Sequence, residues 1–199
     1  LVTSNSDYNL KFDLETEKLI NLVTSIKGDG SIKGTIKDSI LYPEFYQYKY
    51  TKKKKDKNTQ ILFNNSNVQS TSTIPKFDIN NLTPINKNML IDVIDPITGI
   101  IYIGNYELNK ECTNNYKIFD GKRRYNLTYT NKFEKDGYII CRLTQKKIAG
   151  FKVSNDKNDV FKPAQVIDTY FKKINDTYIL EKIITKNNFS NLLIKVDYF

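Results

Sequence analysis

Histidine and tryptophan are absent from this chain of 199 residues, and only two cysteines and one methionine occur. The lack of histidine excludes Ser-His-Asp and Cys-His nucleophile systems, zinc sites with histidine ligands and acid–base catalysis by imidazole. The two cysteines lack the spacing of a metal site, and no run of eighteen apolar residues could span a bilayer. We therefore expect no enzyme activity, no metal or other cofactor, and no transmembrane segment.

Alanine and arginine are scarce, with 2 and 3 residues, whereas the chain holds 28 Lys, 25 Ile and 23 Asn. Lysine, isoleucine and asparagine share A/T-rich codons, so the profile indicates a low-GC genome. A solvated lysine surface then explains the net charge of +9, although nucleic acid or an anionic lipid would also suit it. The few alanines beside 14 Tyr and 11 Phe favour strands over helices.

Apolar and polar residues alternate in many short stretches, which is the pattern of half-buried strands. Asp120-Gly121 and the polar residues at 64–67 are turn signals, and the basic run at 52–58 indicates an exposed hairpin tip. The predicted strands cover residues 8–14, 31–36, 42–51, 59–63, 68–73, 116–119, 123–130, 138–145, 178–185 and 192–198. With no linker or internal repeat, we interpret residues 1–199 as one mainly β domain. Its long, curved antiparallel sheet has a concave face covered by one or two short helices.

Helical spacing of apolar residues occurs twice. Residues 18–26 suit a short helix or an irregular crossing, and residues 84–103 suit a longer helical region. Within the second region Pro96 breaks the first helix, and Asp95 can cap a second, shorter one. The apolar stripe of the first helix consists of Met89, Leu90, Val93 and Ile94.

Four short segments and the two cysteines follow one another in a recognisable order and spacing. The segments are LYPEFY at 41–46, DVIDPITG at 92–99, YKIFDGKRRY at 116–125 and IAGF at 148–151, with Cys112 and Cys141 between them. On these residues the chain resembles the bacterial "domain of unknown function 3108" family, in its proteobacterial branch, from about residue 8 to residue 199. The family motif residues are Asp95, Pro96, Phe119, Asp120, Gly121, Arg123, Arg124 and Tyr125.

This resemblance implies an exported, periplasmic protein of the cell envelope without assigned enzymatic chemistry. It also implies an antiparallel half-barrel, similar to that of periplasmic lipoprotein carriers. Members of the family begin with a signal peptide, which is not visible before Leu1. The resemblance therefore implies that the chain is a mature or truncated form.

Cys112 and Cys141 flank a predicted hairpin, and the strand from Tyr138 pairs back beside it. In the oxidising compartment that the resemblance implies, the two cysteines can form a disulfide. Such a bond would stabilise the fold by roughly 3–4 kcal/mol. In a cytosolic protein they would instead be separate buried thiols. We predict the disulfide.

Arg123 and Arg124 are adjacent, in a chain that otherwise uses lysine. A guanidinium group holds a carboxylate or a phosphate through two hydrogen bonds, which an ammonium group cannot do. The structural interpretation is an ion pair between Asp120 and Arg123 across a tight turn, with Arg124 packed over Tyr125. The alternatives are binding of an anion, such as a lipid head group, and catalysis.

Three acidic residues, Asp92, Asp95 and Glu111, could be read as a pair of catalytic carboxylates. A paired-carboxylate enzyme needs both groups in one cleft at a fixed separation. Asp95 is better explained as the cap of a helix that begins at Pro96. We therefore expect a structural role for these carboxylates.

A half-barrel covered by short helices can leave apolar surface on its concave face, and such pockets commonly bind ligands. We expect a groove there for a lipid, an acyl chain or an apolar protein segment, with residues 89–103 as its lid. The alternative function is a structural scaffold with an envelope protein as partner. Nucleic-acid binding, by Tyr46, Tyr48 and Tyr50 beside the basic tip, is less favoured. The candidate lining residues are Phe12, Tyr46, Tyr48, Phe63, Met89, Val93 and Tyr129.

Overall fold

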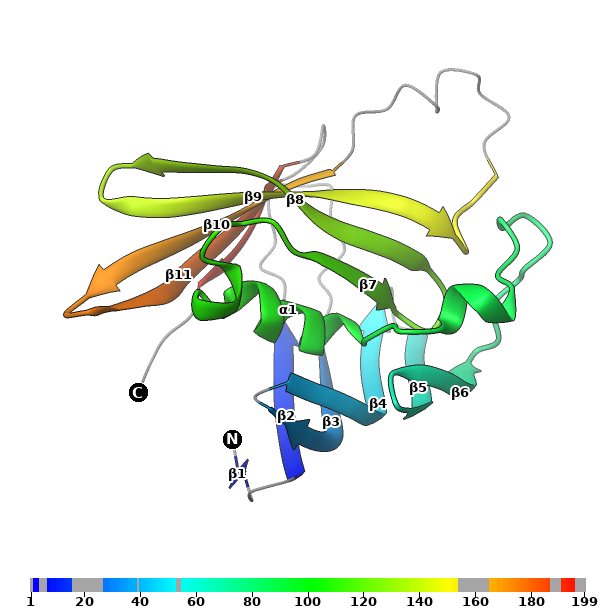
Figure 1. The fold of residues 1–199 in the computed structure, drawn as a ribbon. Helices are drawn as coiled ribbons and strands as arrows, with labels where there is room; N and C mark the ends of the chain where they lie inside the picture. Colours follow the sequence, from blue (N-terminus) through cyan, green and yellow to red (C-terminus); the bar gives the residue numbers. More distant parts are fainter. Residues whose placement is uncertain are drawn as a thin grey trace.

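Two six-stranded antiparallel sheets form the protein, with a short α-helix between them (Figure 1). The computed structural model describes residues 2–3, 7–15, 27–38, 40–52, 55–153, 165–186 and 191–195. The first sheet contains β1 (Val2–Thr3), β2 (Asp7–Glu15), β3 (Lys27–Lys37), β4 (Ile40–Lys52), β5 (Lys55–Asn64) and β6 (Asn67–Ile74). The second contains β7 (Asn115–Phe119), β8 (Arg124–Lys135), β9 (Tyr138–Ala149), β10 (Gln165–Ile174), β11 (Thr177–Lys186) and β12 (Asn191–Lys195). In each sheet, strands adjacent in the sequence are neighbours in space.

The predicted fold class is confirmed: the protein is mainly β, and one antiparallel sheet is strongly curled into a half-barrel. The expectation of one continuous sheet is wrong, because the segment between β6 and β7 leaves the first ladder and crosses to the second. This crossing contains η1 (Lys87–Leu90), α1 (Pro96–Gly104) and η2 (Glu107–Asn109). Residues 81–83 of the crossing also pair with residues 150–153 at the end of β9. The strand β10 had not been predicted.

The helix α1 joins two hydrophobic clusters, one for each sheet. Ile97 packs against the cluster of the first sheet, whereas Ile103 is buried in the cluster of the second. The Tyr102 hydroxyl donates to the carbonyl of Leu41 in β4 and accepts from its N–H, both at 2.7 Å. The helix is therefore in contact with both sheets and connects their two hydrophobic clusters.

Only the second half of the predicted helical region 84–103 is an α-helix. Asp95 caps α1 as predicted, because its buried carboxylate accepts hydrogen bonds from the N–H groups of Ile97 and Thr98, both at 2.9 Å. The predicted first helix is reduced to the single 3-10 turn η1, which contains Met89 and Leu90. Asp92 has a left-handed φ of 52°, and Ile94 pairs with Ile118 of β7, so the rest of the apolar stripe belongs to an irregular crossing.

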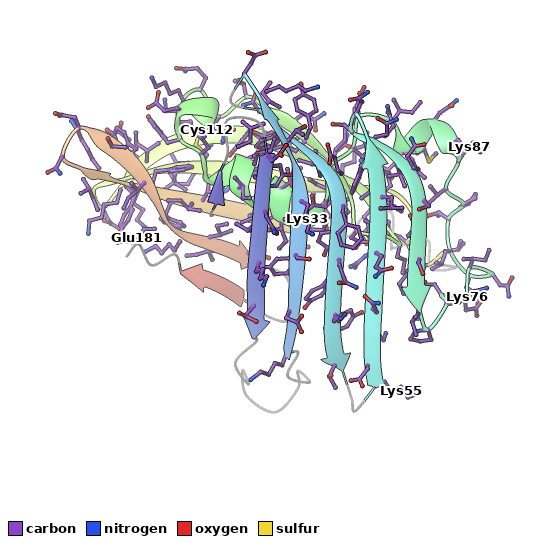
Figure 2. All side chains as sticks on the ribbon, turned by 90° about the horizontal axis from the view of Figure 1, so that it is seen from below. Lys33, Lys55, Lys76, Lys87, Cys112 and Glu181 are labelled. Atoms are coloured by element: carbon purple, nitrogen blue, oxygen red, sulfur yellow. A yellow bond between two sulfur atoms is a disulfide. The ribbon has the colours of Figure 1, made fainter. Side chains whose placement is uncertain are left out.

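The basic hairpin tip is shorter than predicted. β4 ends at Lys52 and β5 begins at Lys55, and these two residues pair with each other. Lys55 is exposed at the end of the sheet that lies away from Lys87 (Figure 2). Residues 53–54 lie outside the described residues, as does the possible helix at 18–26.

Candidate functional site

The inner face of the first sheet, which faces α1, carries successive rows of paired residues. The three rows, each in the order β2, β3, β4, β5, are Leu10-Ile32-Tyr46-Ile61, Phe12-Gly30-Tyr48-Thr59 and Leu14-Gly28-Tyr50-Lys57. The first row closes the core, since Ile32 and Ile61 are fully buried there. In the next two rows β3 carries Gly30 and Gly28, which have no side chain of their own. The inner face is therefore covered there by the aromatic side chains of the neighbouring strands.

The space above these glycines is used by aromatic rings that lie close to the backbone. A Cβ atom added at Gly30 would come within 2.3 Å of the Phe12 ring, and one added at Gly28 within 2.9 Å of the Tyr48 ring. The ring centres are 5.8 Å apart for Phe12 and Tyr48 and 5.0 Å apart for Tyr48 and Tyr50. We call Phe12, Tyr46, Tyr48 and Tyr50 the aromatic floor. Burial raises the pKa of Tyr46 and of Tyr48, so these hydroxyls stay neutral at physiological pH.

The aromatic floor bounds a cavity of about 800 Å³ between the two sheets, which we call the inter-sheet cavity. The start of α1 contributes Pro96, Ile97 and Ile100 to its wall, and the crossing segment contributes Phe77 and Leu82. This volume lies within the range of about 300–1,000 Å³ in which proteins bind one small ligand. The cavity is therefore large enough for such a ligand, and its floor and the wall formed by α1 are apolar and aromatic.

One side of the inter-sheet cavity is basic. We call its cations the basic rim: Lys57, Lys122, Arg123, Lys147 and Lys152. The Lys122 ammonium lies 4.7 Å from the ring centre of Phe77, and that of Lys147 lies 5.5 Å from the ring centre of Phe151. Among the lining residues the rim faces a single carboxylate, that of Asp120.

Lys122 experiences the positive charge of this rim directly. Burial lowers the pKa of its ammonium group, and the nearby charges of Arg123, Lys57 and Lys152 lower it further. Asp120 has the opposite effect on this pKa, but it does not cancel the decrease. The cations of the rim are thus close enough to repel one another.

The β7–β8 turn, residues 120–123, holds part of this rim in place. The Asp120 carboxylate accepts hydrogen bonds from the N–H groups of Lys122 (2.9 Å) and Arg123 (2.6 Å), and Gly121 adopts a left-handed φ of 88°. The guanidinium of Arg123 pairs with the same carboxylate at 2.7 Å. The predicted ion pair across a tight turn is therefore present.

Arg124 does not pack over Tyr125 as expected. It is buried, and its guanidinium donates to the carbonyls of Met89 (3.0 Å) and Tyr125 (2.6 Å) and to the side chain of Asn126 (2.7 Å). All three acceptors belong to the protein itself, and Arg124 is not among the residues that line the cavity. Arg124 thus fastens the crossing segment to β8, which leaves Arg123 as the arginine of the rim.

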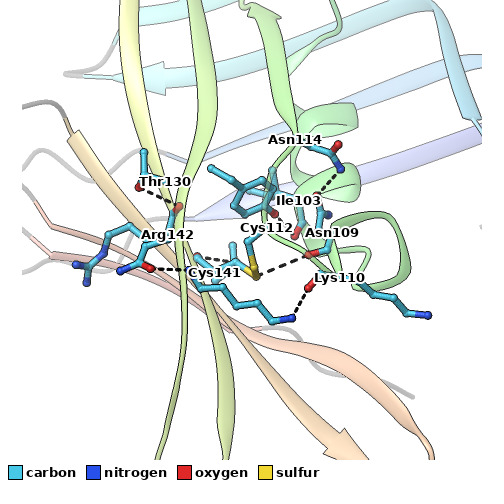
Figure 3. Close-up of a disulfide and its surroundings, with 12 residues drawn as sticks. Ile103, Asn109, Lys110, Cys112, Asn114, Thr130, Cys141 and Arg142 are labelled. Atoms are coloured by element: carbon cyan, nitrogen blue, oxygen red, sulfur yellow. Dashed lines mark hydrogen bonds between the residues drawn. A yellow bond between two sulfur atoms is a disulfide. The ribbon is translucent and has the colours of Figure 1, made fainter.

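The predicted disulfide between Cys112 and Cys141 is present, with Cα atoms 5.6 Å apart (Figure 3). It joins the turn after η2 to the central strand β9, and both cysteines are buried. Beside it, the buried Asn109 side chain donates to the carbonyls of Tyr102 (2.6 Å) and Asn105 (2.7 Å). The disulfide and Asn109 together hold the C-terminal end of α1 against the second sheet.

Three of the seven predicted lining residues, Phe12, Tyr46 and Tyr48, line the inter-sheet cavity. The other four do not. Phe63 and Val93 are buried in the cluster of the first sheet, because their side chains complete its closed core. Tyr129 is buried in the cluster of the second sheet, and Met89 lies on η1, where its carbonyl accepts from Arg124.

The three acidic residues considered as catalytic carboxylates do not line the cavity. Asp95 is fully buried as the cap of α1, and burial raises its pKa. Asp92 is exposed and lies 3.7 Å from the ammonium of Lys117, and Glu111 is exposed as well. Each has surroundings of its own, so the paired arrangement that such catalysis needs is not assembled.

Sequence reasoning did not find the basic rim as a site. Lys122, Lys147 and Lys152 come from separate segments, and nothing distinguishes them from the other lysines in the sequence. It also missed the ion pair of Arg142 with Asp168, in which the Arg142 Nε and Nη2 atoms donate to the two carboxylate oxygens at 2.7 and 2.9 Å. The glycines of β3 are a usable signal, because glycine inside a strand often marks a place where another group approaches the backbone closely.

None of the helices in the described part of the chain is long and apolar enough to cross a membrane. A comparison with curated proteins and one with solved structures found no match. The model of one protein family, described as "Protein of unknown function (DUF3108)", matches residues 2–196. Since this match covers nearly the whole chain, the protein belongs to the DUF3108 family.

Proposed function

We propose that this protein is a non-enzymatic, periplasmic protein of the cell envelope that binds a lipid or another apolar ligand in the inter-sheet cavity. The observation that carries the proposal is the inter-sheet cavity of about 800 Å³ above the aromatic floor. Gly28 and Gly30 let the rings of Tyr48 and Phe12 lie close to the backbone of β3. An aromatic floor beneath an unfilled volume is the composition of a site for an apolar ligand.

The disulfide supports the proposed compartment. Stable disulfides form in oxidising compartments such as the periplasm, and they are rare in the bacterial cytoplasm. Cys112 and Cys141 are bonded and buried, as a structural disulfide requires.

Nucleic-acid binding has less support. The tyrosines that could stack on bases form the floor of the inter-sheet cavity, and Tyr46 is only 4% exposed. A stacking platform needs open ring faces along which a strand of several bases can lie. The aromatic floor is better suited to a ligand that enters the cavity.

Native mass spectrometry of the protein purified from its own envelope tests the proposal. We expect the protein to carry a lipid or fatty ligand that dissociates at higher collision energy. An empty chain that instead retains one protein partner would contradict ligand binding and support the scaffold function.

A binding assay with a neutral fluorescent probe, N-phenyl-1-naphthylamine, tests the position of the site. Tyr48→Ala removes a ring from the aromatic floor, and we expect about tenfold weaker binding of the probe. Phe45→Ala is the matched control, because Phe45 is in the same strand but pairs with the exposed residues Lys33 and Leu62. Equal binding by both variants and the original chain would contradict the assignment of the site to the cavity.

A further inference from the structure

We propose that the ligand of the inter-sheet cavity is a single-chain amphiphile with an anionic head group. Its apolar chain lies on the aromatic floor, and its carboxylate or phosphate binds to Lys122 and Lys147 of the basic rim. This inference rests on the proposed function and names the class of ligand.

The first argument concerns the counter-ions of the rim. Asp120 is the one carboxylate among the residues that line the cavity, and it already accepts from the guanidinium of Arg123 and from two backbone N–H groups. Within the described residues, no carboxylate forms an ion pair with Lys57, Lys122, Lys147 or Lys152. A cluster of like charges beside a low-dielectric interior attracts an anion more strongly than isolated surface lysines do.

The second argument comes from the ring of Phe151. The guanidinium carbon of Arg123 lies 6.0 Å from its centre, and the ammonium of Lys147 lies 5.5 Å from it. Of the two cations at this ring, Arg123 is paired with Asp120, whereas no carboxylate of the described residues pairs with Lys147. An anionic head group placed there would bind the ammonium of Lys147, and its chain would continue onto the apolar surface beside the ring.

The third argument is that the positive charge is local and does not simply reflect the net charge of the chain. A second hollow, of about 720 Å³, lies at the ends of the strands and shares Tyr50 and Lys57 with the inter-sheet cavity. The charges of that hollow are balanced: its acidic lining residues are Asp13, Asp29 and Asp56, and its basic ones are Lys27, Lys49 and Lys57. The excess of cations is found at the inter-sheet cavity, beside the aromatic floor.

The volume of the cavity limits the size of the ligand. About 800 Å³ is within the range for one small ligand, so the apolar part is best matched by one chain. The proposal is therefore a single-chain amphiphile, with its charged end at the rim.

Isothermal titration of the full chain with three ligands of equal chain length tests this inference. The ligands are decanoate, decyl phosphate and decanol, at pH 7.5 and low ionic strength. We expect the two anions to bind about tenfold more tightly than decanol, which is the contribution of one charge-assisted hydrogen bond. This preference should shrink at high salt, because added ions screen the rim. The better of the two anions identifies the head group as carboxylate or phosphate.

The double variant Lys122→Gln/Lys147→Gln should lose the preference for anions but keep the affinity for decanol. Lys146→Gln is the matched control, because Lys146 is the exposed neighbour of Lys147 in β9 and does not line the cavity. Circular dichroism of each variant establishes that it is folded.

The outcomes separate the two proposals. Equal affinities for all three ligands would overturn the anionic head group and leave apolar binding intact. Anion preference that survives the double variant would overturn the role of Lys122 and Lys147. Failure of all three ligands to bind would overturn the proposed function itself.

Discussion

Reduction of the disulfide should lower the free energy of unfolding by about 3.6 kcal/mol. The bond joins Cys112 and Cys141, which are 29 residues apart in the sequence. A crosslink of this span removes conformational freedom from the unfolded chain, and the chain-entropy expression gives about 3.6 kcal/mol at 25 °C. For 199 residues the entropy of unfolding is about 420 cal/mol/K, so the melting temperature should fall by about 9 °C.

Urea unfolding of the oxidised and the reduced protein is the appropriate assay, because no side chain is changed. The chain has no tryptophan, so the transition is followed by far-ultraviolet circular dichroism. Both cysteines are buried, and we therefore expect slow reduction of the folded protein and fast reduction once urea unfolds it. Alkylation of the free thiols confirms that reduction is complete.

Equal unfolding midpoints for the oxidised protein and the fully alkylatable reduced protein would refute this reasoning. They would mean that the crosslink does not restrict the unfolded chain, or that the turn after η2 is already held in place without it. Cys112→Ser/Cys141→Ser provides a check that needs no reductant, although it adds the cost of two buried hydroxyls to the loss of the crosslink.

Three further changes test individual contacts. Arg142→Met should destabilise the fold by roughly 3 kcal/mol, because it leaves the buried Asp168 carboxylate without its ion pair. Arg123→Met should cost less than about 1 kcal/mol, because its partner Asp120 keeps two backbone donors. A larger loss of stability for Arg123→Met than for Arg142→Met in denaturant titration would contradict this reasoning. Burial raises the pKa of Asp95, so the native state holds the proton of this carboxyl group more tightly than the unfolded chain does. The free energy of unfolding of the original chain should therefore fall, relative to that of Asp95→Asn, as the pH rises above about 4. Parallel pH profiles of unfolding for the two proteins would show that the pKa of this carboxyl group is not perturbed. Replacement of the four lysines at 52–55 by serine should change the free energy of unfolding by less than about 1 kcal/mol, and a loss of cooperative folding would contradict the assignment of a hairpin tip.

The strands and the caps could be predicted from the sequence because their signals are local. The alternation around Tyr46 predicts a strand, and the Asp95-Pro96 pair predicts the start of a helix. Each signal needs only a few consecutive residues, and the structure contains both elements. The longer helix expected over Met89 is only one 3-10 turn, because apolar residues at helical spacing also suit a crossing segment that packs between two sheets. Tertiary contacts such as the bridge from Ile94 to β7 decide between the two, and they cannot be read from spacing alone.

The site was only partly predictable for the same reason. The tyrosines of β4 could be placed on one face of a strand, and three of the predicted lining residues do line the cavity. The basic rim combines β5, a turn and the end of β9, so it exists only once the two sheets are packed. Among 28 lysines, position in space is what distinguishes Lys122 and Lys147 from the rest.

The close approach of Phe12 to Gly30 gives β3 an influence on the length of the ligand. A Cβ atom at Gly30 would lie 2.3 Å from the Phe12 ring, so any larger residue at this position would displace that ring. Successive residues on one face of a strand are about 7 Å apart, so a ring displaced along the floor changes the length available to an apolar chain by a comparable distance. Chain-length selectivity in this architecture can therefore be altered through a single position of one strand, while Lys122 and Lys147 of the basic rim are unchanged.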